Sequence, residues 1–279
     1  MSVVFRADGK PVASRLDHWH HVVEETFGPL RLRPPSGAQS PHRLVVGDVG
    51  AVRVAELKVT WTTPSARCEG ARTPRLISRA GPQGYRVDLV VRGRMVVEQD
   101  GREAWLGPGD FSFMDLSRPA RWATSAEHTV AMLFPRTLLP LPSDEVARLT
   151  AVRIPGDQGP GALVAPVARQ LAGHLGDDYG ADDGARLGTA VLDLLTVALA
   201  ARLGSGQRVP QGSRRRVLLQ RVHAFIEQHL GDPGLAPETI AAAHHVSVRY
   251  LYKLFEAQGQ GVAGQVRRRR LERCRRDLL

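Results

Sequence analysis

Three side chains near the C-terminus have the types and the spacing of a surface that contacts a polyanion. Arg249, Tyr252 and Lys253 occupy positions i, i+3 and i+4, which share one face of an α-helix. An arginine can donate two hydrogen bonds to a guanine edge, a tyrosine can contact a base or a phosphate, and a lysine suits a phosphate oxygen. Ser247 stands just ahead of them and is a good N-cap for such a helix. A plain helical hairpin with solvated charges is the alternative interpretation.

A second group of cations follows in the arginine run at positions 267–270, where Arg267 and Arg268 are the candidate nucleic-acid contacts. Residues 213–279 contain 13 Lys or Arg and six Asp or Glu, so this segment holds most of the net charge of +10. A positive field confined to one small segment is typical of a nucleic-acid-binding module. A generic arginine-rich surface is the competing interpretation.

The patterns that metal or nucleophilic chemistry would need are missing from the sequence. A cupin-type metal site needs clustered imidazoles, and the expected strands at 85–91 and 111–114 contain no histidine. Neither a Gly-x-Ser-x-Gly nor a Walker pattern occurs. His18 and His21 can share a helical face, which we interpret as a polar surface rather than a metal site. We therefore expect no catalytic residue, no bound metal and no cofactor.

The two cysteines, Cys68 and Cys274, lie far apart in the sequence, which indicates a reducing compartment rather than a disulfide framework. Arg67 could lower the pKa of the Cys68 thiol, so a redox-sensing thiol is an alternative to an ordinary loop cysteine. No signal segment opens the chain, and no run of 18 apolar residues occurs in it. We expect a cytoplasmic protein that does not enter a membrane.

The basic residues must be positioned by helices. The pattern predicts helices over 214–230 and 237–244, a third that begins at Ser247 and ends near Ala257, and a basic amphipathic helix over 266–279. The second and third helices would pack at a steep angle through six apolar positions, which leaves the basic face outward: Ile240, Ala241, Val246, Leu251, Leu254 and Phe255.

The N-terminal half has a different periodicity. A short helix is expected over 16–27, and β-rich runs between closely spaced turn signals then predict an antiparallel sandwich or barrel over 43–134. The clearest hairpin is 95–105, because Asp100-Gly101 tolerates positive φ. Four large side chains are expected inside the barrel, where they either contact a small organic effector or form plain core: Tyr85, Trp105, Phe113 and Met114.

Helical periodicity returns after Pro142 and predicts an antiparallel pair of helices over 161–175 and 184–203. Residues 204–213 have the composition of a flexible linker. The second helix carries an apolar stripe that is either a dimerisation face or a surface buried against the barrel of the same subunit: Leu187, Val191, Leu194, Leu195 and Ala198.

These patterns resemble a known family of transcription regulators. The C-terminal run Ile240-Ala241-(x4)-Val246-Ser247-(x2)-Tyr250-Leu251-(x2)-Leu254-Phe255 is similar to the first half of an AraC/XylS DNA-binding domain. In that resemblance Arg249, Tyr252 and Lys253 align with base-facing or backbone-facing positions of the first recognition helix. Upstream, segments such as Gly107-Pro108-Gly109-Asp110 and Leu133-Phe134-Pro135-Arg136 resemble the AraC-binding-like sensory domain.

The resemblance implies an α+β protein with an N-terminal cupin-like antiparallel β-barrel, flanking helices and a helical hairpin, plus a C-terminal all-α helix-turn-helix module. It divides the chain into a sensory domain (1–142), a dimerisation hairpin (143–203), a linker (204–213) and a DNA-binding module (214–279). The implied function is sequence-specific regulation of transcription. The implied partners are double-stranded DNA, a small organic effector and a second copy of the chain, with RNA polymerase as a further partner to consider.

One departure from the family pattern concerns the C-terminus. Members carry two helix-turn-helix units, whereas this sequence reaches Leu279 within the helix that would join them, so we expect a form truncated before the second unit. Each base pair that is read contributes about 1–3 kcal/mol, and half of the contacts would be lost. Two alternatives therefore stay open: a DNA-binding-deficient regulator that acts by heterodimerisation, and a cupin-type small-molecule enzyme.

Overall fold

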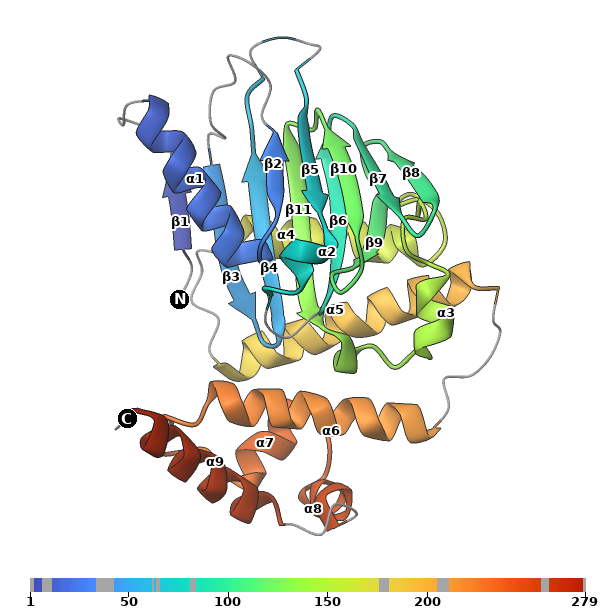
Figure 1. Cartoon of the computed structure of the whole chain (residues 1–279). Coiled ribbons are helices and arrows are strands. Elements are labelled where there is room, and N and C mark those ends of the chain that lie inside the picture. Colours follow the sequence, from blue (N-terminus) through green and yellow to red (C-terminus); the bar gives the residue numbers. More distant parts are fainter. Residues whose placement is uncertain are drawn as a thin grey trace.

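The computed structural model describes residues 3–6, 12–33, 43–61, 63, 66–80, 84–175, 181–204, 211–256 and 261–277. The N-terminal half forms two antiparallel sheets that face each other (Figure 1). The larger sheet has the order β1 (Val3–Arg6), β3 (Arg43–Val49), β4 (Val52–Lys58), β11 (His128–Pro135), β6 (Gly84–Arg92) and β9 (Phe111–Asp115). The smaller sheet has the order β2 (Arg31–Arg33), β5 (Cys68–Arg72), β10 (Ala120–Thr124), β7 (Met95–Gln99) and β8 (Arg102–Leu106).

The predicted hairpin is present as β7 and β8. Asp100 and Gly101 form its turn, with φ angles of 55° and 73°. These left-handed values match the twist of the flanking strands, which is why an Asp-Gly pair fixes the register here. The sequence-based expectation of a tight turn at this position is confirmed.

One apolar core fills the space between the two sheets. It includes Leu44 and Met114 from the larger sheet and Val97 and Trp122 from the smaller one. The helix α1 (Val12–Phe27) begins earlier than the predicted residue 16 and closes one side of this core with buried side chains: Trp19, Val22, Val23 and Phe27.

A second core lies on the outer face of the larger sheet, where helices cover it. The chain leaves β11 through a short 3-10 turn, η1 (Arg136–Leu138), and α3 (Ser143–Ala147), and then forms α4 (Gly161–Gly173) and α5 (Ala181–Arg202). The small helix α2 (Pro74–Ile77) follows β5. The central part of the larger sheet is therefore buried on both faces, which explains why apolar residues of β6 and β9 do not follow a strict alternation.

The apolar stripe of α5 faces the barrel of its own subunit. Val191, Leu195 and Ala198 are 3% exposed or less, and Leu187 and Leu194 pack partly buried against the same core. Of the two interpretations of this stripe, burial against the same subunit is the one that the structure favours, and Val191, Leu195 and Ala198 are not free to contact a second copy. The reason is that the outer face of the larger sheet needs an apolar cover, and α5 supplies it.

The length and composition of α5 would also allow a membrane span. Within the described residues it is the one helix that passes this test, over Asp182–Arg202. Half of that window is buried inside the molecule. A core helix of a globular protein meets the same criterion, so the finding gives no independent support for a membrane.

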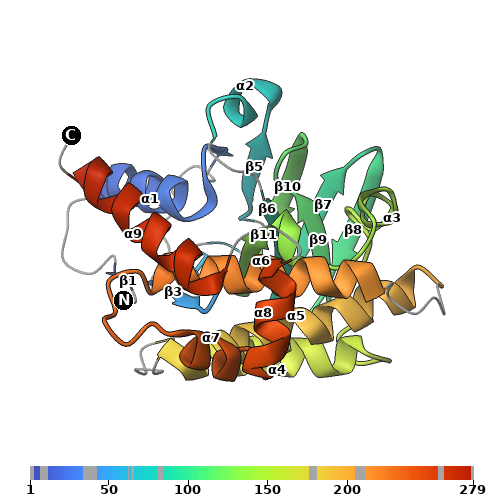
Figure 2. The same ribbon diagram turned by 90° about the horizontal axis from the view of Figure 1, so that it is seen from below.

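Four helices form the C-terminal module: α6 (Gln211–Gln228), α7 (Pro237–Ala243), α8 (Val248–Glu256) and α9 (Val262–Asp277). Residues 205–210 of the expected linker lie outside the described residues, and α6 already begins within the last residues assigned to that linker. The module lies below α5, with α6 nearest to the barrel and α7, α8 and α9 on the far side (Figure 1). Seen from below, α7, α8 and α9 are the foremost helices (Figure 2).

Candidate nucleic-acid interface and effector site

The helix α8 has one buried and one exposed face. Leu251, Leu254 and Phe255 are at most 1% exposed and join the core of the module. Arg249, Tyr252 and Lys253 lie on the exposed side, together with Ser247 in the preceding turn. The structure thus exposes all four predicted residues, and α8 itself is one of the foremost helices when the molecule is seen from below (Figure 2).

The start of α8 is fixed by its predicted N-cap. The Ser247 hydroxyl accepts a hydrogen bond from the backbone N–H of Tyr250 at 3.1 Å. Tyr250 is itself 41% exposed, close to the 42% of Tyr252, and was missing from the sequence-based set of candidates. Its place three residues after the N-cap could have suggested it, because the exposed side of a helix includes such neighbours.

The four arginines at the start of α9 divide into two pairs. Arg269 bonds to Glu227 and Glu272, and these carboxylates raise its pKa further, so it stays charged. Arg270 donates to the carbonyl oxygen of Leu230 and ties α9 to the end of α6. Arg267 and Arg268 are exposed, although Arg268 also contacts Gln265 and Glu272. The two arginines that the sequence singled out are the two that the structure turns outward.

The predicted effector residues do not share one cavity. Tyr85 and Phe113 belong to the core under α4 and α5, and only Met114 of the four lies between the sheets. Trp105 is 67% exposed on β8 and bonds to the Glu103 carboxylate. The prediction that Tyr85, Trp105 and Phe113 line the barrel interior is therefore wrong. On β8 the smaller Ala104 and Leu106 point inward instead. On β6 and β9 both faces are buried, so the sequence pattern does not indicate which face each side chain occupies.

Polar side chains that sequence analysis missed lie in the barrel interior. Arg86 on β6 donates from Nε and Nη2 to the same oxygen of Asp88, Oδ1, at 2.9 and 2.7 Å. The guanidinium lies 4.4 Å from the ring centre of Phe27 and 5.4 Å from that of Trp122. Charged residues at alternate positions of an apolar strand, Arg86-Val87-Asp88, were the signal that could have revealed this pair.

Two buried oxygens, one in this pair and one on the neighbouring strand, have no hydrogen-bond partner among the described residues. They are Oδ2 of Asp88 and Oγ of Ser112, whose residues are direct cross-strand neighbours on β6 and β9. Burial raises the pKa of Asp88, while Arg86 acts in the opposite direction. Unpartnered polar atoms in a protein interior are uncommon, and here the Asp88 oxygen can accept a hydrogen bond while the Ser112 hydroxyl can donate or accept one.

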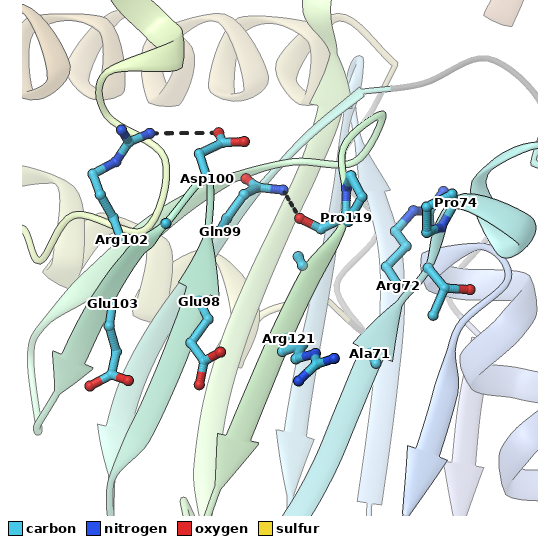
Figure 3. Close-up of a pocket in the computed structure, with 13 residues that line it drawn as sticks. Ala71, Arg72, Pro74, Glu98, Gln99, Asp100, Arg102, Glu103, Pro119 and Arg121 are labelled. Atoms are coloured by element: carbon cyan, nitrogen blue, oxygen red, sulfur yellow. Dashed lines mark hydrogen bonds and ion pairs between the residues drawn. The ribbon is translucent and has the colours of Figure 1, made fainter.

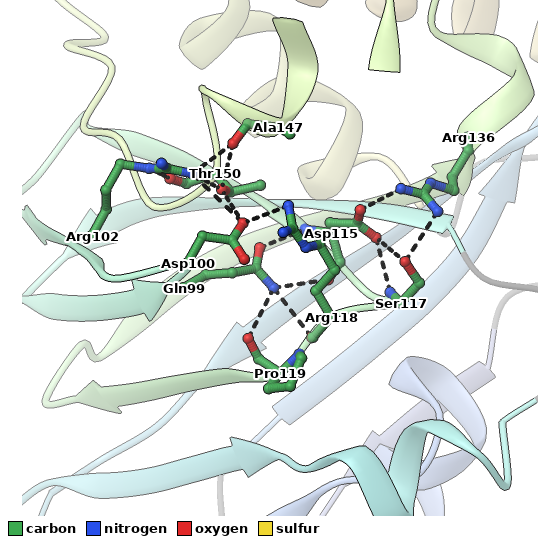
Figure 4. Close-up of polar contacts among 10 residues, drawn as sticks. All are labelled: Gln99, Asp100, Arg102, Asp115, Ser117, Arg118, Pro119, Arg136, Ala147 and Thr150. Atoms are coloured by element: carbon green, nitrogen blue, oxygen red, sulfur yellow. Dashed lines mark hydrogen bonds and ion pairs between the residues drawn. The ribbon is translucent and has the colours of Figure 1, made fainter. Parts of the chain in front are cut away.

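A separate hollow of about 440 Å³ lies at the end of the smaller sheet (Figure 3). Its wall includes Gln99, Asp100 and Arg102, whose polar atoms already have partners within the chain. Gln99 donates to the carbonyl oxygen of Asp115, and Arg102 donates to that of Thr150 (Figure 4). The first bond fastens the β7–β8 hairpin to β9 and the second fastens it to the segment after α3, so we interpret the wall of this hollow as structural.

Cys68 does not have the environment of a reactive thiol. Burial raises its pKa to about 11, and the neighbouring Glu69 carboxylate acts in the same direction. The expectation that Arg67 could lower this pKa is wrong. Among the described residues no group of three or more His, Cys, Asp or Glu side chains could hold a metal ion.

Comparison with known proteins identifies the domain that contains the barrel. Residues 19–200 match the AraC-binding-like domain, which is more than half of the chain. The chain belongs to the AraC-binding-like family. The matched range contains the second half of α1, the strands β2 to β11, the helix α4 and all but the last two residues of α5.

Two curated relatives of this AraC-binding-like protein extend the comparison. The transcriptional activator NphR of Rhodococcus sp. is 34% identical over 213 residues, which cover 75% of this chain and 62% of NphR. An uncharacterized protein from the nit 5′ region of Bacillus sp. strain OxB-1 is 29% identical over 253 residues, with 85% and 91% of the two chains covered. The matched part thus spans less than two thirds of NphR.

A solved structure shows the same fold along almost the entire chain. The AraC-like transcriptional activator CuxR superposes with a TM-score of 0.61 at 21% identity, covering 98% of this chain and 95% of that one. Its likeness includes the C-terminal helices as well as the barrel. At this identity the likeness shows the fold alone, which is a barrel followed by a helical module.

Proposed function

We propose that this chain is a cytoplasmic transcription regulator that binds double-stranded DNA through α8 and α9 and responds to a small organic effector. The observation that carries the proposal is the exposed face of α8. There Arg249, Tyr252 and Lys253 lie outward on a helix whose other side is buried. A helix with such a face fits a major groove about 12 Å wide. Homodimers would present two such helices to repeated half-sites, and RNA polymerase is a further partner.

The effector site in this proposal is the barrel interior. The Asp88 and Ser112 oxygens would accept hydrogen bonds from the effector, and Trp122 and Phe27 would contact its apolar part. Effector binding there changes the affinity for DNA only if the effector favours one conformation of the protein over another. No enzymatic step belongs to the proposal, because β6 and β9 supply no imidazole for metal chemistry.

The test is fluorescence anisotropy of the purified chain on duplexes selected from a random library, at about 50 and about 200 mM salt. Arg249→Ala should lower the affinity for the selected duplex more than the affinity for a random one, by about 5–150-fold. The reason is that a bidentate contact to guanine contributes about 1–3 kcal/mol. Arg267→Ala should weaken both duplexes alike and lower the salt dependence by about one phosphate contact.

A matched control is Arg121→Ala, which removes an exposed arginine from β10. It should leave both affinities unchanged. Binding that is weak, that depends only on electrostatic attraction to phosphates and that Arg249→Ala does not change would contradict sequence-specific DNA recognition. That result would favour a regulator that acts by pairing with another protein.

A further inference from the structure

The turn between β3 and β4 contacts both the barrel-side helix α5 and the C-terminal helix α6. Gln228 on α6 donates a hydrogen bond from Nε2 to the carbonyl oxygen of Gly50, at 2.7 Å. Gly50 has a φ of +60°, and a Cβ added to it would lie 2.9 Å from the Cα of Ala185 on α5. The turn is thus wedged between two helices that belong to different halves of the chain.

Ala185 on α5 packs into the core of the C-terminal module, although it precedes that module in the sequence. It is 6% exposed and clusters with residues of α6, α7 and α8, among them Phe225 and Ile240. Its short side chain lets α5 approach the module closely. The module is therefore docked on the AraC-binding-like domain by packing as well as by covalent connection.

A line of contacts leads from the same turn to α8. Phe225 lies one helical turn before Gln228, and its ring meets His244 edge-on at 5.4 Å between centres. His244 is the C-cap of α7. His245 follows with a φ of 52°, and Ser247 then caps α8. Gly50, Ala185, Phe225, Gln228 and His244 all line one small cavity, so these contacts converge at a single junction.

The other side of this turn faces a pocket at the mouth of the barrel. The pocket has a volume of about 420 Å³, and its wall includes Phe27, Tyr85, Gly50 and Gln228. Phe27 also contacts Arg86 of the interior polar pair. Both residues of the hydrogen bond that links the two halves, Gly50 and Gln228, therefore line the pocket at the barrel mouth.

We propose that the junction of Gly50, Ala185, Phe225, Gln228 and His244 is a relay that couples the barrel mouth to the helix α8, an inference that rests on the proposed function. On the side of α5 a small displacement of the turn cannot be absorbed locally, because a Cβ on Gly50 would already lie 2.9 Å from the backbone of Ala185. Coupling between two sites is reciprocal, so DNA bound at α8 must also alter the turn.

This reciprocity allows a test without knowledge of the effector. Hydrogen exchange of the backbone amides in residues 49–53 and 225–230 is measured in the full chain, with and without the tightest duplex of the selected library. In the wild type, saturating DNA should change the exchange rate of residues 49–53 by about fivefold or more, as expected for ordinary allosteric coupling.

Two variants should break the relay. Ala185→Leu overfills the junction, and Gln228→Ala removes the hydrogen bond to Gly50. Both should speed exchange of residues 49–53 in the absence of DNA and abolish the response to DNA. The matched controls are Ala190→Leu, at an exposed position of α5, and Gln170→Ala, at an exposed position of α4, and both should behave as the wild type. Gln228 is exposed, so its variant should fold even if Ala185→Leu does not.

The outcomes separate the relay from the proposed function. Variants that exchange like their controls would overturn the relay, as would bound DNA that leaves residues 49–53 of the wild type unchanged. If the chain binds no duplex at all, the proposed function fails and the relay to DNA fails with it. Exchange without DNA would still report whether the junction docks the two halves.

Discussion

Glu56 is the carboxyl group whose environment has the clearest consequence for stability. It is 5% exposed, and its Oε1 contacts Lys58 Nζ at 2.8 Å and His128 Nε2 at 2.9 Å. Burial alone would raise its pKa, but the bonds from His128 and Lys58 outweigh burial and lower the pKa from 4.5 to about 2. A carboxyl with a lowered pKa in the folded state stabilises the protein above the unfolded pKa and loses that contribution as the pH falls.

We therefore expect Glu56 to stabilise the fold at pH 7 and to lose this contribution between pH 4.5 and about 2. One pKa unit corresponds to about 1.4 kcal/mol, so the contribution that Glu56 loses is at most about 3.5 kcal/mol. Urea unfolding of Glu56→Gln at both ends of this range should show a smaller pH dependence than the wild type. Glu24→Gln, at an exposed position of α1, is the control. Equal pH dependence in Glu56→Gln and the wild type would contradict the assignment.

Two buried hydroxyl groups differ in a way that a pair of substitutions can detect. Ser112 Oγ has no partner among the described residues, whereas Thr150 Oγ1 donates to Asp100 Oδ2 at 2.7 Å. Removal of an unsatisfied polar atom avoids its desolvation cost, while removal of Thr150 Oγ1 loses the net contribution of a hydrogen bond, since Asp100 Oδ2 keeps its ion pair with Arg118. Ser112→Ala should therefore be neutral or stabilising, and Thr150→Val should cost about 0.5–1.5 kcal/mol in urea unfolding. A similar loss in both variants would mean that Ser112 has a partner in solution.

At the scale of elements, the orientation of α5 can be tested by substitutions on its two faces. Leu195 is 0% exposed against the barrel, and Val197, two residues later, is 55% exposed. Leu195→Ala should cost about 2–5 kcal/mol of unfolding free energy, because it leaves a cavity. Val197→Ala should change it by less than about 0.5 kcal/mol. Equal effects in chemical denaturation would contradict the orientation of α5.

The C-terminal helices were predictable because each has one buried and one solvated face. On α8, Leu251, Leu254 and Phe255 alternate with Arg249, Tyr252 and Lys253, so the period of the sequence determines both the helix and its orientation. Ser247 as N-cap and the Asp100-Gly101 turn were predictable for the same local reason, since their conformations depend on neighbouring residues alone.

The barrel interior was less predictable because both faces of its larger sheet are buried. Phe113 and Met114 are equally apolar, yet one packs under α4 and α5 and the other lies between the sheets. The direction of each depends on where distant helices pack, which periodicity cannot encode. The Arg86–Asp88 pair was missed because large apolar residues were sought as the lining.

At the scale of the whole molecule, the three apolar cores are divided unequally between the two halves. The cores between the sheets and under α4 and α5 are built within residues 1–204, whereas the third needs Ala185 from α5. A chain ending at Gly204 should therefore fold, with a cooperative thermal transition by circular dichroism. Residues 211–279 alone should be less stable, because they lose Ala185. A truncated chain without a cooperative transition would show that the module is needed for folding of the barrel.

The ends of the smaller sheet bear on how the protein avoids aggregation. β2 and β8 are the terminal strands of that sheet, and a terminal strand exposes unpaired backbone groups that can recruit a strand from another molecule. β2 places the exposed Arg31 and Arg33 on this edge, and β8 begins with Arg102 and Glu103. The exposed charges of Arg31, Arg33 and Glu103 at these edges oppose association with a strand of another molecule.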